Sequence, residues 1–187
     1  MSNNLFIPNW ESSIDNTLVD SIINHLESEK SVALKDFNFL EYTKGITFEN
    51  EQCENGMYIF RFSDGKYYVG KASSCTLLER ISKHIDGRRW GGFNAVLKEL
   101  GYNDKSLDYH IENQLAFLNA KVVLLPISWK SLSQSNVDPK IDKPLHKLES
   151  DLILLFKKRF SETQVFNKTN PKELSGMFEL SLIKINQ

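Results

Sequence analysis

Membrane spans, targeting signals and paired cysteines are what this sequence lacks. A transmembrane helix needs about 20 consecutive apolar residues, and no segment of the 187-residue chain approaches that. The N-terminus has neither the basic region nor the apolar run of a signal peptide. The two cysteines, Cys53 and Cys75, do not have metal-ligand spacing, so neither structural zinc nor a disulfide is expected. We expect a cytoplasmic protein with no membrane partner.

Motifs of several catalytic classes are missing as well. The chain contains no Glu-x-Lys, which argues against the commonest restriction-nuclease core. It also lacks the Gly-x-Ser-x-Gly elbow, the Gly-x-x-x-x-Gly-Lys-Ser/Thr phosphate loop and the His-Glu-x-x-His zinc motif. The formal net charge is −1, so the chain does not have the excess of basic residues that is usual in dedicated nucleic-acid-binding proteins.

What is present is the composition of one ordinary globular domain. Hydrophobic residues make up 41% and charged residues 25% of the chain, and both values are typical of globular proteins. The length suits a single domain, residues 1–187, with a sizeable core. We expect a helical N-terminal extension over residues 1–50 and a C-terminal strand over residues 171–187.

The strongest local signal is a β-hairpin. Aromatic and β-branched runs at residues 57–62 and 66–71 flank the turn Ser63-Asp64-Gly65. Such runs on either side of an Asp-Gly turn are a strong short-range indication of a hairpin. We therefore expect two antiparallel strands here.

A helix is expected directly after the hairpin. Thr76 and Glu79 have the spacing of a capping box, and Gly87 supplies a C-terminal stop. Arg80 and His84 are four residues apart and so lie on one side of this helix. Periodicity alone leaves open whether that side is a solvated flank or a functional surface. The residues expected to face the sheet are Leu77, Leu78, Ile81 and Ile85.

Glu149 interrupts the apolar face of a later helix. The segment 144–156 begins with Pro in its first turn, as many helices do. Desolvating an unpaired carboxylate costs several kcal/mol, so Glu149 needs a cation, a metal or hydrogen bonds nearby, unless it lies at an edge and reaches water. His146 could share a metal with it, but we expect His146 to be solvated. The apolar stripe consists of Leu145, Leu148, Leu152, Ile153 and Phe156.

Two tripeptides give these elements a family resemblance. Gly56-Met57-Tyr58 and Tyr68-Val69-Gly70, followed by Arg80 and His84, resemble the GIY-YIG nuclease family, whose name spells both tripeptides. The resemblance covers residues 55–170 and is closest to small stand-alone restriction endonucleases. It implies an α+β fold in which a small central sheet of about three strands starts with a hairpin and is flanked by helices.

The resemblance implies a divalent-metal-dependent endonuclease that hydrolyses DNA phosphodiester bonds with Mg²⁺ or Mn²⁺. The role could be restriction, another defence or DNA processing, and a homodimer on DNA is one possible assembly. The alternative is a catalytically silent nucleic-acid-binding or regulatory protein with the same fold. The implied catalytic residues are Tyr58, Tyr68, Lys71, Arg80, His84 and Glu149.

Each implied residue has a task. Glu149 would hold the metal, Tyr58 would activate the attacking water, and Tyr68 would help to position the phosphate or the water network. A free phenol has a pKa near 10, so Tyr58 would need the cations Lys71, Arg80 and His84 to lower that pKa. Arg80 would also bind the charge that develops on the phosphate.

Three further residues are candidates for substrate binding. Asn167, which follows Phe166, matches an asparagine that the family carries after its glutamate helix, and would position the phosphate or water. Arg88 and Arg89 precede Trp90 and could contact phosphates or stack on bases. An ordinary solvated surface explains that stretch equally well.

The hairpin register decides whether both tyrosines can serve one site. A two-residue loop would put Tyr58 opposite Lys71 and turn Tyr68 to the other face. A three-residue loop with Gly65 left-handed shifts the pairing by one residue and places both tyrosines on one face. We favour the second register, because a site that uses both tyrosines requires it.

The other segments are expected to form scaffold. They are an amphipathic helix over 14–28, helices over 94–100 and 107–118, a buried strand over 120–127, a polar loop over 128–143 and a strand over 178–185.

Overall fold

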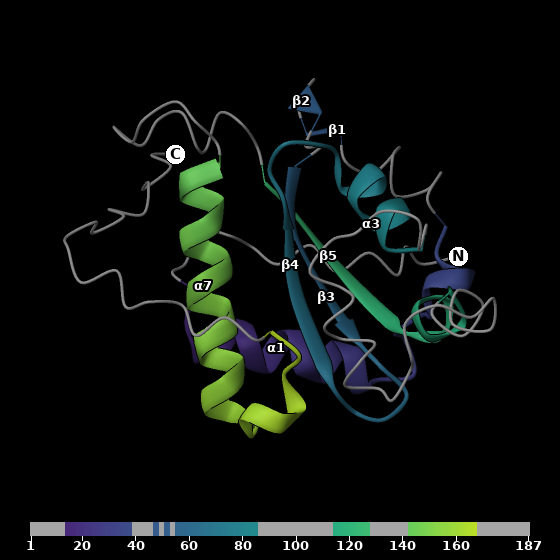
Figure 1. Ribbon diagram of the computed structural model, residues 1–187, viewed down its shortest axis with the longest axis vertical. Coiled ribbons are helices and arrows are strands. Elements are labelled where there is room, and N and C mark those ends of the chain that lie inside the picture. The colour runs from purple at the N-terminus through teal and green to yellow at the C-terminus, as the bar shows by residue number, and fades with distance from the viewer. Residues whose placement is uncertain are drawn as a thin grey trace, which may run out of the picture.

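The computed structural model describes residues 14–38, 47–48, 51–52, 55–85, 114–127 and 142–167 (Figure 1). A short helical segment also covers residues 114–119. The elements are α1 (Asn16–Glu27), a 3-10 turn η1 (Leu34–Asp36), β1 (Thr47–Phe48), β2 (Glu51–Gln52), β3 (Asn55–Arg61), β4 (Tyr67–Ala72), α3 (Leu77–Ile85), β5 (Lys121–Ile127), α7 (Asp142–Arg159) and a 3-10 turn η2 (Glu162–Gln164).

The central sheet has three antiparallel strands in the order β4-β3-β5. It starts with the β3–β4 hairpin, and helices flank it, so the α+β class expected from the sequence is confirmed. The strand expected over 120–127 is β5. The short strands β1 and β2 pair separately, so the end of the N-terminal extension is not helical at 47–48.

The hairpin has the register that we favoured. Tyr58 pairs with Gly70 and Phe60 with Tyr68, which puts both tyrosines on one face of the sheet. The Gly65 N–H donates to the Phe62 carbonyl at 3.0 Å, and the Phe62 N–H donates to the Lys66 carbonyl at 2.9 Å. Gly65 has φ +81°, the left-handed conformation that a three-residue loop of this type requires.

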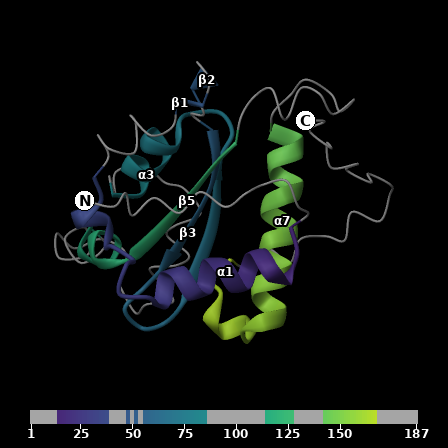
Figure 2. The same ribbon diagram turned by 180° about the vertical axis from the view of Figure 1, so that it is seen from behind.

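Both faces of the sheet are buried, which explains why its strands are apolar almost throughout. Side chains alternate between the faces along a strand. Tyr58 and Phe60 of β3 point to the face covered by α3, and Met57 and Ile59 to the face covered by α1 and α7. Figures 1 and 2 show α3 on one side of the sheet and α7 with α1 on the other.

Helix α1 is part of this core. The Leu18 N–H donates to Oδ1 of Asp15 at 3.0 Å, so Asp15 caps the helix. Ile14 and Leu18 are only partly buried and pack at the margin of the core. The helix expected over 14–28 is confirmed as α1. Its buried residues are Val19, Ile22, Ile23 and Leu26.

Several predicted features lie outside the described residues. They are Cys53, Gly87, Arg88, Arg89, the helix over 94–100, the strand over 178–185 and most of the loop over 128–143. Within the described ranges, no helix is long and apolar enough to cross a membrane.

Candidate active site

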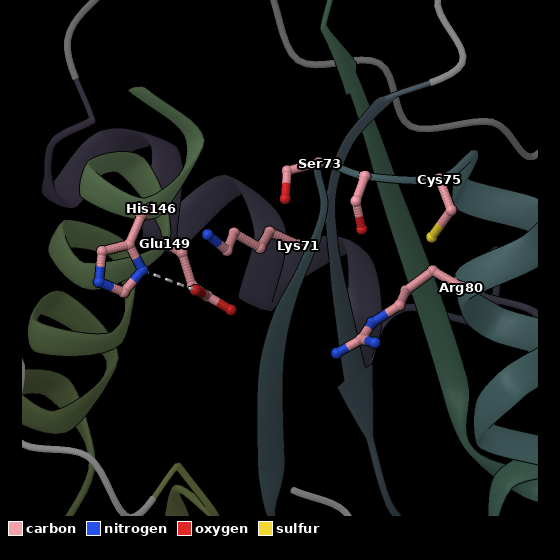
Figure 3. Close-up of a pocket in the computed structure, with 7 residues that line it drawn as sticks. Lys71, Ser73, Cys75, Arg80, His146 and Glu149 are labelled. Atoms are coloured by element: carbon pink, nitrogen blue, oxygen red, sulfur yellow. Dashed lines mark ion pairs between the residues drawn. The ribbon is translucent and has the colours of Figure 1, made fainter. Parts of the chain in front are cut away.

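A pocket of about 410 Å³ lies where the edge strand β4 ends and the chain turns into α3. Lys71 pairs with Met57 and so shares the sheet face that α7 covers. Arg80 comes from α3 on the opposite face. The pocket therefore reaches around the edge of the sheet and joins side chains from both faces (Figure 3). It is lined by Lys71, Ser73, Ser74, Cys75, Arg80, His146 and Glu149.

Glu149 has the cationic neighbours that its place on an apolar helix face demands. The carboxylate side chain is 17% exposed. Burial raises the pKa of Glu149, and Lys71, His146 and Arg80 oppose that rise. In Figure 3 the Lys71 ammonium and the Glu149 carboxylate point toward each other across the pocket. The carboxylate is thus held at the edge of the stripe, facing positive charge.

Arg80 is positioned by the start of α3. The Glu79 N–H donates to Oγ1 of Thr76 at 3.1 Å, the helix cap that the sequence indicated. Burial by itself lowers the pKa of Arg80, but the hydroxyls of Tyr58 and Tyr68 more than offset this and leave the pKa raised. The guanidinium is therefore a permanent cation, and Figure 3 shows it directed into the pocket.

Behind Arg80, Tyr58 and His84 form a buried pair. Tyr58 is 0% exposed, and its Oη lies 2.6 Å from Nε2 of His84. Arg80 donates from Nε to the same Oη at 3.4 Å. Tyr68 lies beside the pair, with its ring centroid 6.2 Å from that of Tyr58.

The proton of this pair belongs to the tyrosine. Burial, followed by the neighbouring Tyr68, raises the pKa of Tyr58 well above 10, and Arg80 opposes that only in part. Burial and then Arg80 lower the pKa of His84 to about 3. At neutral pH a phenol therefore lies against a neutral imidazole, and the tautomer of His84 sets which of the two donates across the 2.6 Å contact.

This overturns one expectation about Tyr58. Nearby cations were expected to lower its pKa, but the pKa is raised, because the cost of burying a phenolate exceeds the help from Arg80. His84 is neutral and supplies no positive charge. Lys71 lies on the other sheet face and is not among the causes of the shift.

Only some of the catalytic residues that the resemblance implies line the pocket. Arg80, Glu149 and Lys71 line the pocket, whereas Tyr58, Tyr68 and His84 are not among the residues that line it. The two tyrosines and His84 pack together against α3 instead.

No family model, curated protein or solved structure matches this chain. The GIY-YIG resemblance therefore rests on the motif residues themselves, and it stays a hypothesis.

The glycine of each tripeptide is required by a close approach. A Cβ at Gly70 would overlap the ring and hydroxyl of Tyr58, which lies across it. A Cβ at Gly56, where φ is +154°, would overlap the carbonyl oxygen of Leu125 in β5. Both glycines thus have structural reasons that are independent of any resemblance.

Asn167 acts on the hairpin rather than in the pocket. The Val69 N–H donates to Oδ1 of Asn167 at 3.0 Å, and Nδ2 of Asn167 donates to the Val69 carbonyl at 2.7 Å. One amide side chain thus closes the edge of β4 next to Tyr68 and Gly70. Asn167 is not among the residues that line the pocket. Its predicted contact with substrate stays a prediction, and its observed contacts position the strand.

Asn55 was missed by sequence reasoning. Its Nδ2 lies 3.2, 3.3 and 3.1 Å from the carbonyl oxygens of Ala72, Ser73 and Cys75, respectively. Asn55 therefore holds the turn that forms one wall of the pocket. The sequence shows a polar residue at the head of a strand, but the partner carbonyls are 17 to 20 residues away and no local pattern reveals them.

Proposed function

We propose that the protein is a divalent-metal-dependent endonuclease that hydrolyses DNA phosphodiester bonds. The observation that carries this proposal is the pocket in which Glu149 faces the cations Lys71 and Arg80. A scissile phosphate needs positive charge on its oxygens and a carboxylate that can hold a hard metal ion. The order of the tripeptides, Arg80 and Glu149 along the chain supports the same function.

The donor set fits Mg²⁺ or Mn²⁺. Mg²⁺ is commonly held by one or two carboxylates, with substrate phosphates and waters completing its shell. Among the described residues, no group of three or more His, Cys, Asp or Glu side chains could hold a metal ion. Glu149 would therefore hold the ion together with substrate oxygens. The bound ion would supply Lewis-acid stabilisation of the charge on phosphate.

Arg80 and Lys71 bind the phosphodiester from opposite sides of the β4 edge. Arg80 presents a planar, permanently charged guanidinium that suits the non-bridging oxygens. Lys71 adds a point charge next to Glu149. Because both cations lie in the pocket before substrate arrives, they stabilise developing negative charge without rearranging.

Tyr58 and His84 act as one proton-transfer unit. Oη of Tyr58 is buried in the free protein, so substrate binding would have to bring water to it; Oη would then take a proton from that water while its own proton moves to Nε2 of His84 along the 2.6 Å contact. In the free protein this transfer is unfavourable, because burial and Arg80 hold the pKa of His84 at about 3. A phosphate paired with Arg80 would remove the second of these penalties.

One observation favours the catalytically silent alternative. Tyr58 is fully buried and its pKa is raised, which suits a packing role. A protein of this kind would bind nucleic acid through Lys71 and Arg80 and leave it intact.

Nicking of supercoiled plasmid with Mg²⁺, Mn²⁺ or EDTA tests the proposal, and matched single-stranded DNA, duplex DNA and RNA define the substrate. Glu149→Gln should abolish cleavage. Asp151→Asn is the matched control, because Asp151 lies on the same helix and pairs with Lys147 at 2.9 Å. Cleavage by Glu149→Gln at the wild-type rate, or DNA binding without metal-dependent cleavage, contradicts the endonuclease assignment.

A further inference from the structure

His146 and Glu149 place two atoms that can ligate a metal close together in the pocket. They lie three residues apart on α7, and Nδ1 of His146 is 3.5 Å from Oε2 of Glu149 (Figure 3). A charge-assisted hydrogen bond is shorter, about 2.7–2.9 Å. Two ligand atoms that are each about 2.1 Å from one ion, at an angle of 90° to 110°, lie about 3.0–3.4 Å apart. The observed separation is that of a loose ion pair between the two side chains, and it is also close to the separation of two ligands on one ion.

We propose that His146 is the second protein ligand of the metal site at Glu149, and that the site prefers Mn²⁺ or Co²⁺ to Mg²⁺. The inference rests on the proposed metal site and extends it. Imidazole nitrogen suits first-row transition metals, whereas Mg²⁺ strongly prefers oxygen. Helical proteins that bind metals through a Glu-x-x-His pair use the same three-residue spacing with the two residues in the opposite order.

The charges in the pocket explain why a second ligand matters. Lys71 and Arg80 both act on the Glu149 carboxylate, so a single carboxylate faces two cations that repel a metal ion. A neutral imidazole adds affinity without adding positive charge. His146 is well placed for this, because its side chain is 60% exposed and its Nδ1 is turned toward Glu149.

Metal binding by the untagged full-length protein at neutral pH, without nucleic acid, tests the inference. Co²⁺ is followed by its visible absorption and Mn²⁺ by electron paramagnetic resonance, and Mg²⁺ is added as a competitor of Mn²⁺. His146→Ala should lower the affinity for Co²⁺ and Mn²⁺ by at least about 10-fold and change the Co²⁺ spectrum. Its affinity for Mg²⁺ should change by less than about threefold. Glu149→Gln should weaken all three ions.

His25→Ala is the matched control, because His25 lies on α1 and is not among the residues that line the pocket. It should bind all three ions as the wild type does. Unchanged Co²⁺ affinity in His146→Ala overturns the inference but leaves the endonuclease proposal standing. Absence of Co²⁺ binding by the wild type also overturns it. Metal binding as expected without plasmid cleavage contradicts the proposed function alone.

Discussion

The hydroxyl of Tyr58 lies 2.6 Å from Nε2 of His84, and both side chains are buried. Opposite shifts keep the proton on the tyrosine, because burial raises the pKa of Tyr58 and lowers that of His84. The pair is therefore neutral in the free protein. The stability of the buried pair depends on both groups being neutral, and so does any proton transfer between them.

Acid should destabilise the protein through His84. The folded-state pKa of about 3 lies below the ordinary value of 6.5, so the unfolded chain binds the proton first. Stability is then lost as the pH falls from about 6.5 toward 3. Lowering the pH from about 6.5 to about 4.5 should cost on the order of 2 kcal/mol in the free energy of unfolding.

Urea denaturation at these two pH values measures that cost. His84→Gln keeps a hydrogen-bond partner for Tyr58 but cannot titrate. The free energy of unfolding of this variant should therefore lose most of the pH dependence that is due to His84. His25→Gln is the control, because His25 is partly exposed and its lowered pKa should contribute less. An identical pH dependence in wild type and His84→Gln would show that His84 is not buried as a neutral imidazole.

Gly70→Ala should displace the Tyr58 ring, because the added methyl group would overlap it. Overpacking of this kind costs about 1–3 kcal/mol. A double-mutant cycle with Tyr58→Ala isolates the contact, since the cost of the alanine should largely vanish once the ring is gone. Equal costs in both backgrounds, measured by denaturation, would exclude the contact as the reason for glycine at this position.

Under the proposed function, Tyr58→Phe should slow cleavage by ~10²–10⁴-fold and leave DNA binding nearly unchanged. His84→Gln should slow it similarly, and the double variant should be no slower than the worse single variant, because the two groups move one proton.

Arg80→Ala should weaken turnover and DNA binding together. Single-turnover rates and binding titrations give both readouts. A Tyr58→Phe protein that retains more than about a tenth of wild-type activity would remove Tyr58 from water activation.

Glu149→Gln should abolish metal-dependent cleavage and leave the Tm of the metal-free protein equal or higher. Burial raises the folded-state pKa of Glu149, so the stabilising contribution of its protonated form is lost as the pH rises through that value. At neutral pH the charge is then a net cost that glutamine removes. Thermal unfolding in EDTA measures this, and a clear fall in Tm would mean that the pairing with Lys71 outweighs the burial.

Asn167→Ala should destabilise the hairpin edge by about 2 kcal/mol, because it leaves both backbone groups of Val69 without their amide partner. Amide hydrogen exchange at Val69 should become faster. The exposed Asn119 is the matched control, and Asn119→Ala should change stability by less than about 0.5 kcal/mol. Slow exchange at Val69 in Asn167→Ala would contradict the clamp.

Local patterns in the sequence determine the secondary structure that builds the site. The Asp64-Gly65 turn and its apolar flanks specify the hairpin, and Thr76 specifies the start of α3, because turns and caps depend on residues only a few positions apart. The apolar stripe around Glu149 specifies α7 and indicates that the carboxylate needs a partner. These features required no knowledge of distant contacts.

Tertiary structure alone decides which groups share the pocket and how they ionise. Lys71 and Arg80 come from opposite faces of the sheet and meet only because β4 is an edge strand. The carbonyl partners of Asn55 and the strand held by Asn167 are 17 or more residues away in the sequence. The pKa of Tyr58 rises rather than falls, because the depth of burial outweighs a single neighbouring cation. Burial depends on how the whole chain packs, and no local pattern encodes it.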